Sequence, residues 1–521
     1  MDGSGSGKSA SYSIPNAHQC LGSYVFTDPK GELYDMTAGY LKEQGYDIKV
    51  LNLVRPQYSD GYNPLMHISS ELDVDVIANT IVKGQKTDSG SDPYWDDMAE
   101  MLLKALIYYL IATRPEEEQN LASCAELVRA ANKNGGSNLL SDLMSQLPYD
   151  HPARMYYKSI EIAPEKTYGS ILSSLQSKLG KFDSKEIAEL TSTDTINFEE
   201  IGSKKTAVYV ISSDTHTAYD FLLTIFFSQM IQQLYDYADQ NGGRLKERTY
   251  FILDEFANIG KIPDFDKKIS TSRSRGISFS VILQNIDQLE AVYEKSYETI
   301  MGNCDTHVFL GSNSFKTVEY FSKQLGEKTI DRDSISINKD KQNHRTGKSL
   351  SDQVMARALM TPDELRRLDN DLCIIFEKGL KPVKAKKFYY FKHSMAKEMA
   401  RYQISHNDIG EIDRGTWRKY NPYNPYVEED EEKKVENLNI ESLDDLFEDD
   451  DKKEPVPVIK NDAGIDSKVQ EDNETLDSLL NPRVDADAPL LPQDEEEDTY
   501  DLQKELEAKF DELFGPLDDD E

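Results

Sequence analysis

Short apolar runs alternate with amphipathic stretches over the first 69 residues. The apolar run in "SYVFTDPKGELYD" (residues 23–35) predicts a buried strand ending at Asp28, followed by a turn and a helix from Glu32. The run "YDIKVLNL" (46–53) predicts a second strand, and residues 10–20 predict a short helix limited by Pro15. Strands that alternate with helices in this way are typical of a parallel sheet.

The spacing of apolar residues changes between residues 70 and 175. In "WDDMAEMLLKALIYYLIATR" (95–114) and "LASCAELVRAANK" (121–133) they recur three and four positions apart, which places them on one face of a helix. Strand signals disappear over the same stretch. We therefore predict an all-helical insertion domain at 70–175, set into an α/β domain formed by residues 1–69 and 176–425.

The strand pattern resumes after the insertion. The apolar runs "KTAVYVIS", "RTYFILDEF", "GISFSVILQN" and "DTHVFLGS" predict strands, with a long helix at 216–238 between the first two. "DLCIIFEKG" (371–379) predicts a further strand, followed by "AKKFYYF" (385–391). The fold class predicted by these runs is α/β, with a parallel sheet at its core.

Charge separates the last part of the chain from the rest. Residues 428–521 contain 36 acidic and 9 basic side chains, a net charge of −27, which leaves −8 of the total −35 for the first 427 residues. A segment this acidic and poor in large apolar residues is predicted to be a disordered tail, which we place at 426–521. Within it "LDDLF" (443–447), "LDSLL" (476–480) and "FDELF" (510–514) are either short partner-binding helices or chance amphipathic segments.

The first nine residues, "MDGSGSGKS", carry most of the pattern of a phosphate-binding loop. Glycines let consecutive backbone N–H groups turn toward a phosphate, and the lysine and hydroxyl reach the terminal phosphates and Mg²⁺. The candidate residues are Gly3, Gly5, Gly7, Lys8 and Ser9. Asp2 stands where the first glycine of the pattern belongs, and the strand that normally delivers the loop is expected upstream, so the sequence is expected to be truncated at its N-terminus.

A second "GKS" occurs at 347–349 in the polar stretch "KQNHRTGKSLS". It has no glycine-rich residues before it. We predict that it lies in a loop and matches the pattern by coincidence.

Acidic residues follow a predicted strand at "YFILDEF". Asp254 and Glu255 then lie at its C-terminal end, where Asp254 can hold Mg²⁺ together with Ser9 and Glu255 can activate a water molecule. Gln284, at the end of the next predicted strand, can sense the terminal phosphate. Either Arg273 or Arg275 can reach a neighbouring subunit's nucleotide as an arginine finger, and the sequence does not choose between them.

Other polar groups give weaker signals. Asp28 and Lys30 follow the first predicted strand at the edge where open α/β sheets bind ligands, but a plain turn explains them equally well. Four separated cysteines and eight scattered histidines suggest neither a disulfide framework nor a metal site other than one for Mg²⁺. No apolar run approaches the roughly 20 residues of a membrane helix, so this stretch of chain is expected to be cytoplasmic by itself.

With these residues in place, the chain resembles the TraG/TraD class of type IV coupling proteins, conjugative ATPases of the FtsK/HerA branch of RecA-like enzymes. The matching segments run in order from residue 3 to about 390; they are "GSGSGKS", "TDPKGELYD", "YNPL", "YFILDEFANIGKIPDF", "STSRSRGISFSVILQNIDQL", "GNCDTHVFLGS" and "MTPDELRRL". The sharpest is "DEFANIGKIPDF" followed by "SRSRGIS".

The resemblance implies a RecA-like P-loop fold that binds ATP and Mg²⁺. It implies a homo-hexamer that pumps single-stranded DNA with its relaxase toward a type IV secretion channel at the cytoplasmic face of the membrane, through an N-terminal anchor outside this sequence. It assigns phosphate binding to Lys8 and Ser9, the Walker B pair to Asp254 and Glu255, and the sensor to Gln284.

Two other functions remain open. One is a double-stranded DNA translocase of the FtsK type, although the C-terminus shows no winged-helix module. The other is a non-catalytic cargo receptor of the same apparatus.

Overall fold

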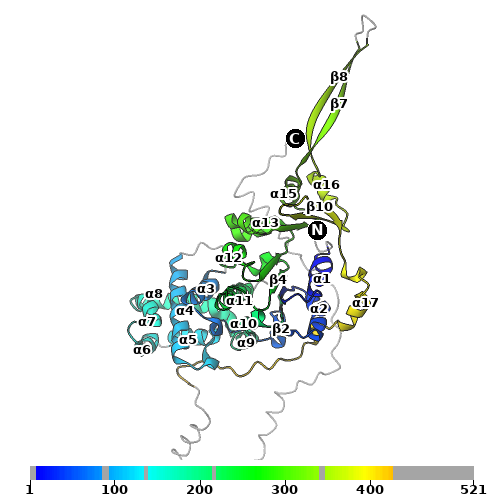
Figure 1. The fold of residues 1–521 in the computed structure, drawn as a ribbon. Helices are drawn as coiled ribbons and strands as arrows, with labels where there is room; N and C mark the ends of the chain where they lie inside the picture. Colours follow the sequence, from blue (N-terminus) through cyan, green and yellow to red (C-terminus); the bar gives the residue numbers. More distant parts are fainter. Residues whose placement is uncertain (1–6, 85–92, 134–138, 214–218, 340–345, 426–521) are drawn as a thin grey trace, which may run out of the picture. The chain divides into compact units, whose positions relative to one another are not determined.

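The computed structural model describes residues 7–84, 93–133, 139–213, 219–339 and 346–425 (Figure 1). Gly3, Gly5, the three amphipathic segments and the acidic tail lie outside these residues. One compact unit extends from Met1 to Glu432.

A five-stranded parallel sheet forms the centre of this unit. Its order is β2–β3–β1–β4–β5, and every neighbouring pair is parallel. The strands are β1 (Ser23–Thr27), β2 (Asp47–Asn52), β3 (Thr206–Ile211), β4 (Thr249–Leu253) and β5 (Ile277–Val281). The predicted parallel sheet is confirmed, and all five strands coincide with predicted apolar runs.

Both faces of the sheet are buried. Alternate strand residues enter two different hydrophobic clusters, so that Val25 belongs to one and Tyr24 and Phe26 to the other. The second cluster packs under α1 (Ile14–Ala17) and α2 (Glu32–Glu43). Burial on both faces explains why the strands are apolar throughout rather than alternating with polar residues.

The hydrophobic cluster on the other face of the sheet includes residues of a long helix and of a group of helices between β2 and β3. The long helix is α11 (Asp220–Gln240). The group comprises α3 (Glu71–Lys83), α4 (Pro93–Thr113), α5 (Leu121–Lys133), α6 (Leu139–Ser145), α7 (Pro152–Glu161), α8 (Glu165–Leu179), α9 (Lys185–Leu190) and α10 (Phe198–Ser203). Helices α4 to α8 lie beside the sheet (Figure 1), and among the described residues the helices continue past residue 175.

A smaller antiparallel sheet, β10–β9–β6, follows α12 (Phe265–Thr271), α13 (Ile286–Tyr293) and α14 (Tyr297–Gly302). Its strands are β6 (Thr306–Phe309), β9 (Leu372–Glu377) and β10 (Val383–Lys386). A third cluster, which includes Phe309, Phe321 and Ile374, packs it against α15 (Phe315–Leu325) and α16 (Pro362–Arg366).

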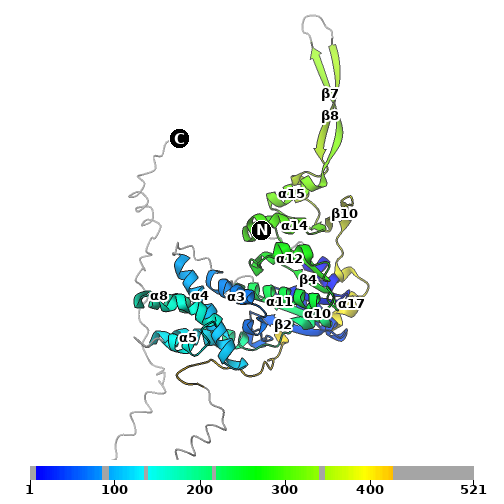
Figure 2. The ribbon, with the colours of Figure 1, turned by 60° about the vertical axis from the view of Figure 1, so that its left-hand side comes forward.

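A long hairpin joins α15 to α16. Strands β7 (Glu327–Lys339) and β8 (Thr346–Ala358) pair in register from Glu327 opposite Ala358 to Lys339 opposite Thr346. Thirteen residues per strand correspond to a ribbon about 44 Å long, and both views show it extending away from the sheets (Figures 1 and 2). The second "GKS" lies in β8 at 347–349, so the prediction of a loop there was wrong: its backbone pairs with β7.

After β10 the chain returns across α2. We call residues 387–409 the C-terminal strap; it contains α17 (Ala396–Met399) and three 3₁₀ turns. His406 Nδ1 lies 2.9 Å from Asp35 Oδ1, and Ile404 N donates to Asp35 O at 3.1 Å. Tyr390 packs against the cluster under α1 and α2. The strap therefore rests on the helices that follow the phosphate-binding loop.

In the part of the chain that the structure describes, no helix combines the length and the apolar character needed to cross a bilayer.

Candidate functional site

Three strands of the parallel sheet end side by side. In the register Thr27 lies opposite Leu253, and Leu253 lies opposite Val281. The residues that follow β1, β4 and β5 therefore emerge at one edge, as carboxyl ends of neighbouring parallel strands must. This edge receives Asp28, the Asp254–Glu255 pair and the segment that leads to Gln284.

The end of the glycine-rich loop begins a helical segment at the same edge. Gly7 has φ +71°, a conformation that glycine adopts without strain, and Ser11 N donates to Gly7 O at 2.8 Å. A helical turn over Ser9–Ser13 continues into α1. Tyr12 Oη lies 2.7 Å from Ser280 Oγ, which ties this turn to β5. The first backbone N–H groups of such a helix are available to an anion.

Lys8, Glu255 and Gln284 meet at a single oxygen atom. Lys8 Nζ lies 3.3 Å from Glu255 Oε1, and Gln284 Nε2 donates to the same oxygen at 3.0 Å. The side chains of Lys8 and Glu255 are 13% and 20% exposed. Three residues singled out far apart in the sequence are thus in direct contact.

Asp254 lies beside this contact in a more enclosed position. Its Oδ1 accepts from Glu255 N at 3.0 Å, and its carbonyl accepts from Thr27 Oγ1 at 2.7 Å. Burial raises the pKa of the Asp254 carboxyl, and the charge of Lys8 opposes that shift. Ser9 follows Lys8 directly, so its hydroxyl comes from the same turn of chain.

The backbone at Glu255 is unusual. Its φ is +49°, the left-handed region that residues with a Cβ rarely adopt. Backbone strain of this kind clusters at functional sites, where the surrounding structure holds a side chain in a required position. At Glu255 it accompanies the contact with Lys8 and Gln284.

The two candidate arginines differ in their surroundings. Arg275 is held in a bidentate ion pair, with Nε and Nη2 each 3.0 Å from an oxygen of Asp239, and its guanidinium lies 4.6 Å from the ring centre of Tyr235. Arg273 has a side chain that is 92% exposed, and Asp305 lies 3.8 Å away. Arg275 is therefore engaged within its own subunit, whereas Arg273 projects into solvent.

Asp28 stabilises the turn between β1 and α2. It is 2% exposed and accepts a hydrogen bond from Tyr34 N at 2.8 Å, which fixes the first turn of α2. Burial raises the pKa of its carboxyl to about 6. Lys30 is exposed on the same turn.

Tyr389 of the C-terminal strap also reaches the loop, and the sequence analysis did not identify it. A Cβ atom placed on Gly7 would come within 2.9 Å of Tyr389 Cε1, so ring and loop are in close contact. The only signal in the sequence was the density of aromatic residues in "KKFYYF".

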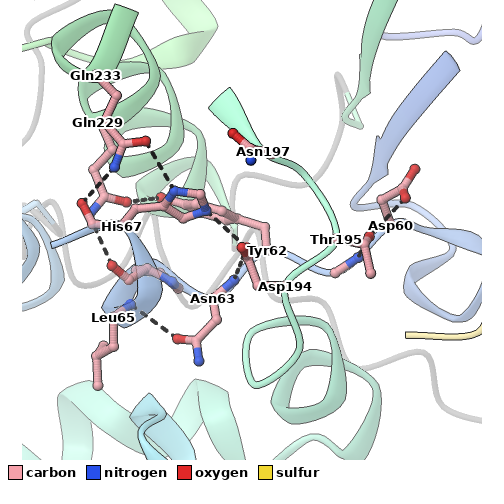
Figure 3. A network of polar contacts seen from close by, with 12 residues as sticks. Asp60, Tyr62, Asn63, Leu65, His67, Asp194, Thr195, Asn197, Gln229 and Gln233 are labelled. Carbon is pink, nitrogen blue, oxygen red and sulfur yellow. Dashed lines mark hydrogen bonds and ion pairs between the residues drawn. The ribbon is translucent and has the colours of Figure 1, made fainter. Parts of the chain in front are cut away.

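A second polar cluster surrounds the "YNPL" segment (Figure 3). His67 Nε2 lies 2.9 Å from Asp194 Oδ1, Tyr62 Oη donates to Gln229 Oε1 at 2.6 Å, and Gln229 Nε2 donates to Pro64 O at 3.0 Å. These partners join the chain after β2 to the chain before β3 and to α11. The hydrogen bonds satisfy the buried polar groups of a chain crossing, which makes this cluster a structural one.

No group of three or more His, Cys, Asp or Glu side chains arranged to hold a metal occurs within the described ranges.

Comparison with known proteins identifies the family. The profile of the family described as "Type IV secretory system Conjugative DNA transfer" matches residues 1–411. The chain belongs to this family. The resemblance to TraG/TraD coupling proteins drawn from the motifs is thereby confirmed.

Curated relatives are identical to the chain at about a quarter of the aligned positions. The conjugal transfer protein TraG of Escherichia coli is 26% identical over 388 residues, which cover 70% of this chain and 60% of TraG. Protein VirD4 of Agrobacterium fabrum is 24% identical over 419 residues, which cover 76% of this chain and 59% of VirD4. The chain thus spans about 60% of the length of the curated relatives it matches.

Solved structures of the family share the fold. The plasmid coupling protein TrwB in complex with the non-hydrolysable ATP analogue ADPNP is 18% identical, with a TM-score of 0.53 over 74% of this chain and 83% of TrwB. This likeness confirms the fold class, which is α/β with a parallel sheet.

Proposed function

We propose that this protein is the ATP-hydrolysing coupling protein of a conjugative DNA transfer system. The observation that supports it most is the meeting of Lys8, Glu255 and Gln284 at one sheet edge, beside the half-buried Asp254. Family membership supports the conjugative role, and the ADPNP complex of TrwB supports ATP as the nucleotide.

The donor set at the edge fits a magnesium nucleoside triphosphate. Gly7 and the start of the following helix present backbone N–H groups, Lys8 supplies a cation, and Ser9 and Asp254 supply hydroxyl and carboxylate oxygens suited to a hard cation. Bound Mg²⁺ would neutralise charge that develops on the phosphates during transfer. Lys8 would exchange its contact with Glu255 for one with the phosphates.

Glu255 then becomes available as a base. Released from Lys8, its carboxylate can orient a water molecule and accept its proton, while Gln284 keeps its donor within reach of the same position. The left-handed backbone of Glu255 directs this carboxylate toward the loop. Arg273, exposed and weakly paired, is the arginine that we assign to a neighbouring subunit's nucleotide.

The larger function rests on the relatives. We propose a homo-hexamer that moves single-stranded DNA and its relaxase toward a type IV secretion channel. The body carries a net charge of only −8, so DNA contacts must come from local basic segments such as "FDKKISTSRSR".

ATP hydrolysis by the full chain, with and without single-stranded DNA, tests the proposal. We expect Lys8→Ala to lower kcat/KM at least about 100-fold, because a preorganised donor to the transferring phosphoryl group is lost. The matched control is Lys42→Ala, an exposed lysine at the end of α2, which should hydrolyse ATP as the wild type does. DNA transfer without any Lys8-dependent hydrolysis would instead indicate the cargo receptor.

A further inference from the structure

A stacked aromatic pair lies against the phosphate-binding loop. Tyr389 and Phe391 have ring centres 5.1 Å apart and planes 21° apart. Tyr389 touches Gly7, and Phe391 is 55% exposed. Tyr389 thus links the loop to an exposed ring, and together the two rings offer a stacking surface to a ligand with an aromatic face.

The pair is held in place from both sides. Tyr389 Oη donates to Asn370 O at 3.2 Å, and the neighbouring Tyr390 packs under α1 and α2. Further along the strap, the contacts of Ile404 and His406 with Asp35 fix it to α2. The aromatic pair therefore does not depend on a ligand for its position.

We propose that Tyr389 and Phe391 form the surface on which the base of the bound nucleotide stacks. The inference rests on the proposed function, because it assumes that the phosphates lie at Gly7 and Lys8. A nucleoside extends outward from its phosphates, and Tyr389 of the pair touches that loop at Gly7. Stacking on an aromatic side chain tolerates any base, since every base has a π face.

Lys392 does not stand in the way of this ligand. Its Nζ lies 4.6 Å from the centre of the Tyr389 ring, and its side chain is 58% exposed with a 3.8 Å contact to Asp371. A cation in so open a position gains little from the ring and can turn aside toward the phosphates. The base then takes the place of the ammonium group.

Binding of two ligands by the full chain tests the proposal: Mg-ATP, and magnesium tripolyphosphate, which has the phosphates but no base. We expect Tyr389→Ala to weaken ATP binding about tenfold, the usual effect of removing one stacked aromatic partner, and to leave tripolyphosphate binding unchanged. Tyr389→Phe keeps the ring and should bind both ligands as the wild type does. GTP should bind within a few-fold of ATP.

The control is Phe388→Ala, which removes an equally exposed ring of the same segment whose partner is His393. It should change neither affinity. Phe391→Leu is a second variant, which keeps an apolar side chain at this position but removes the ring. It should weaken the binding of ATP but not the binding of tripolyphosphate.

Equal loss of both ligands in Tyr389→Ala would overturn the inference, because the ring would then only support the loop. Unchanged ATP binding in both Tyr389→Ala and Phe391→Leu would overturn it as well. Failure of the wild type to bind either ligand would instead contradict the proposed function. The experiment therefore distinguishes failure of the stacking inference from failure of the proposed function.

Discussion

Lys8 Nζ and Glu255 Oε1 lie 3.3 Å apart, although 247 positions separate the two residues in the sequence. The glycine-rich loop delivers one and the end of β4 delivers the other. The two side chains form an ion pair, so a ligand that takes Lys8 also releases Glu255. The first prediction follows from this exchange.

Glu255→Gln separates binding from hydrolysis. Removing the base should lower kcat by about 100-fold or more. Mg-ATP should bind at least as tightly as to the wild type, because Lys8 no longer has to break an ion pair before it binds the phosphates. Single-turnover hydrolysis and equilibrium binding by the same preparation check this. Weaker ATP binding in the variant would show that Glu255 holds the nucleotide rather than competing for Lys8.

The two candidate arginines should give opposite results. Arg273→Ala should reduce ATP hydrolysis at least about tenfold with no change in the free energy of unfolding, since its side chain is 92% exposed and lies 3.8 Å from Asp305. Arg367→Ala, another exposed arginine, is the control. Full activity of Arg273→Ala would exclude it as the finger.

Arg275→Ala should act on stability instead. It removes the bidentate pair with Asp239 and the packing of the guanidinium on Tyr235, so we expect a loss of about 1 kcal/mol in the free energy of unfolding. Urea denaturation measures it. A variant as stable as the wild type but inactive would assign the finger role to Arg275.

Because Asp28 is buried, we expect the free energy of unfolding to depend on pH. Its pKa is raised to about 6 in the fold from a usual value of 3.8, so the folded protein binds the proton more tightly than the unfolded chain. This contribution is fully present below pH 3.8 and is lost as pH rises through 6. The loss amounts to about 3 kcal/mol for a shift of this size.

Asp28→Asn isolates that effect, because the amide oxygen can still accept from Tyr34 N without ionising. The difference in free energy of unfolding between variant and wild type should grow in favour of the variant between pH 4 and pH 7. A constant difference over this range would mean that Asp28 ionises normally in the fold.

The β7–β8 hairpin should be dispensable for folding. Replacing residues 330–355 with Asn-Gly joins Thr329 to Ala356, which are paired in the register, through a two-residue turn that suits a short hairpin. We expect a change in the midpoint of thermal unfolding of no more than about 2 °C, since the ribbon extends away from the sheets (Figure 2). A shortened chain that fails to unfold cooperatively would contradict this.

Local patterns were sufficient for the parallel sheet and for part of the site. β4 was predicted because four apolar or aromatic residues precede Asp254, and burial on both sheet faces demands such a run. Parallel strands end at a common edge, so Glu255 after β4 and Gln284 after β5 were expected to lie close together, whereas Lys8 was expected there from its glycine-rich motif. The roles assigned to these residues stay predictions.

Long-range contacts were not predictable in the same way. The choice between Arg273 and Arg275 depends on Asp239, which lies on α11 and is 36 positions from Arg275. Tyr389 reaches Gly7 only because the chain folds back after β10. The hairpin was missed because the sequences of its two strands are mostly polar, so that no apolar run marks them.

The left-handed backbone at Glu255 places the proposed catalytic role of this residue in conflict with the stability of the fold. Glycine would adopt this conformation without strain, and a non-glycine residue there costs on the order of 1–3 kcal/mol. A Glu255→Gly protein would relax the backbone and lose the carboxylate together. Selection for thermal stability alone would therefore favour loss of the residue on which hydrolysis is proposed to depend. Stabilising this protein by consensus design or laboratory evolution requires that Glu255 be kept.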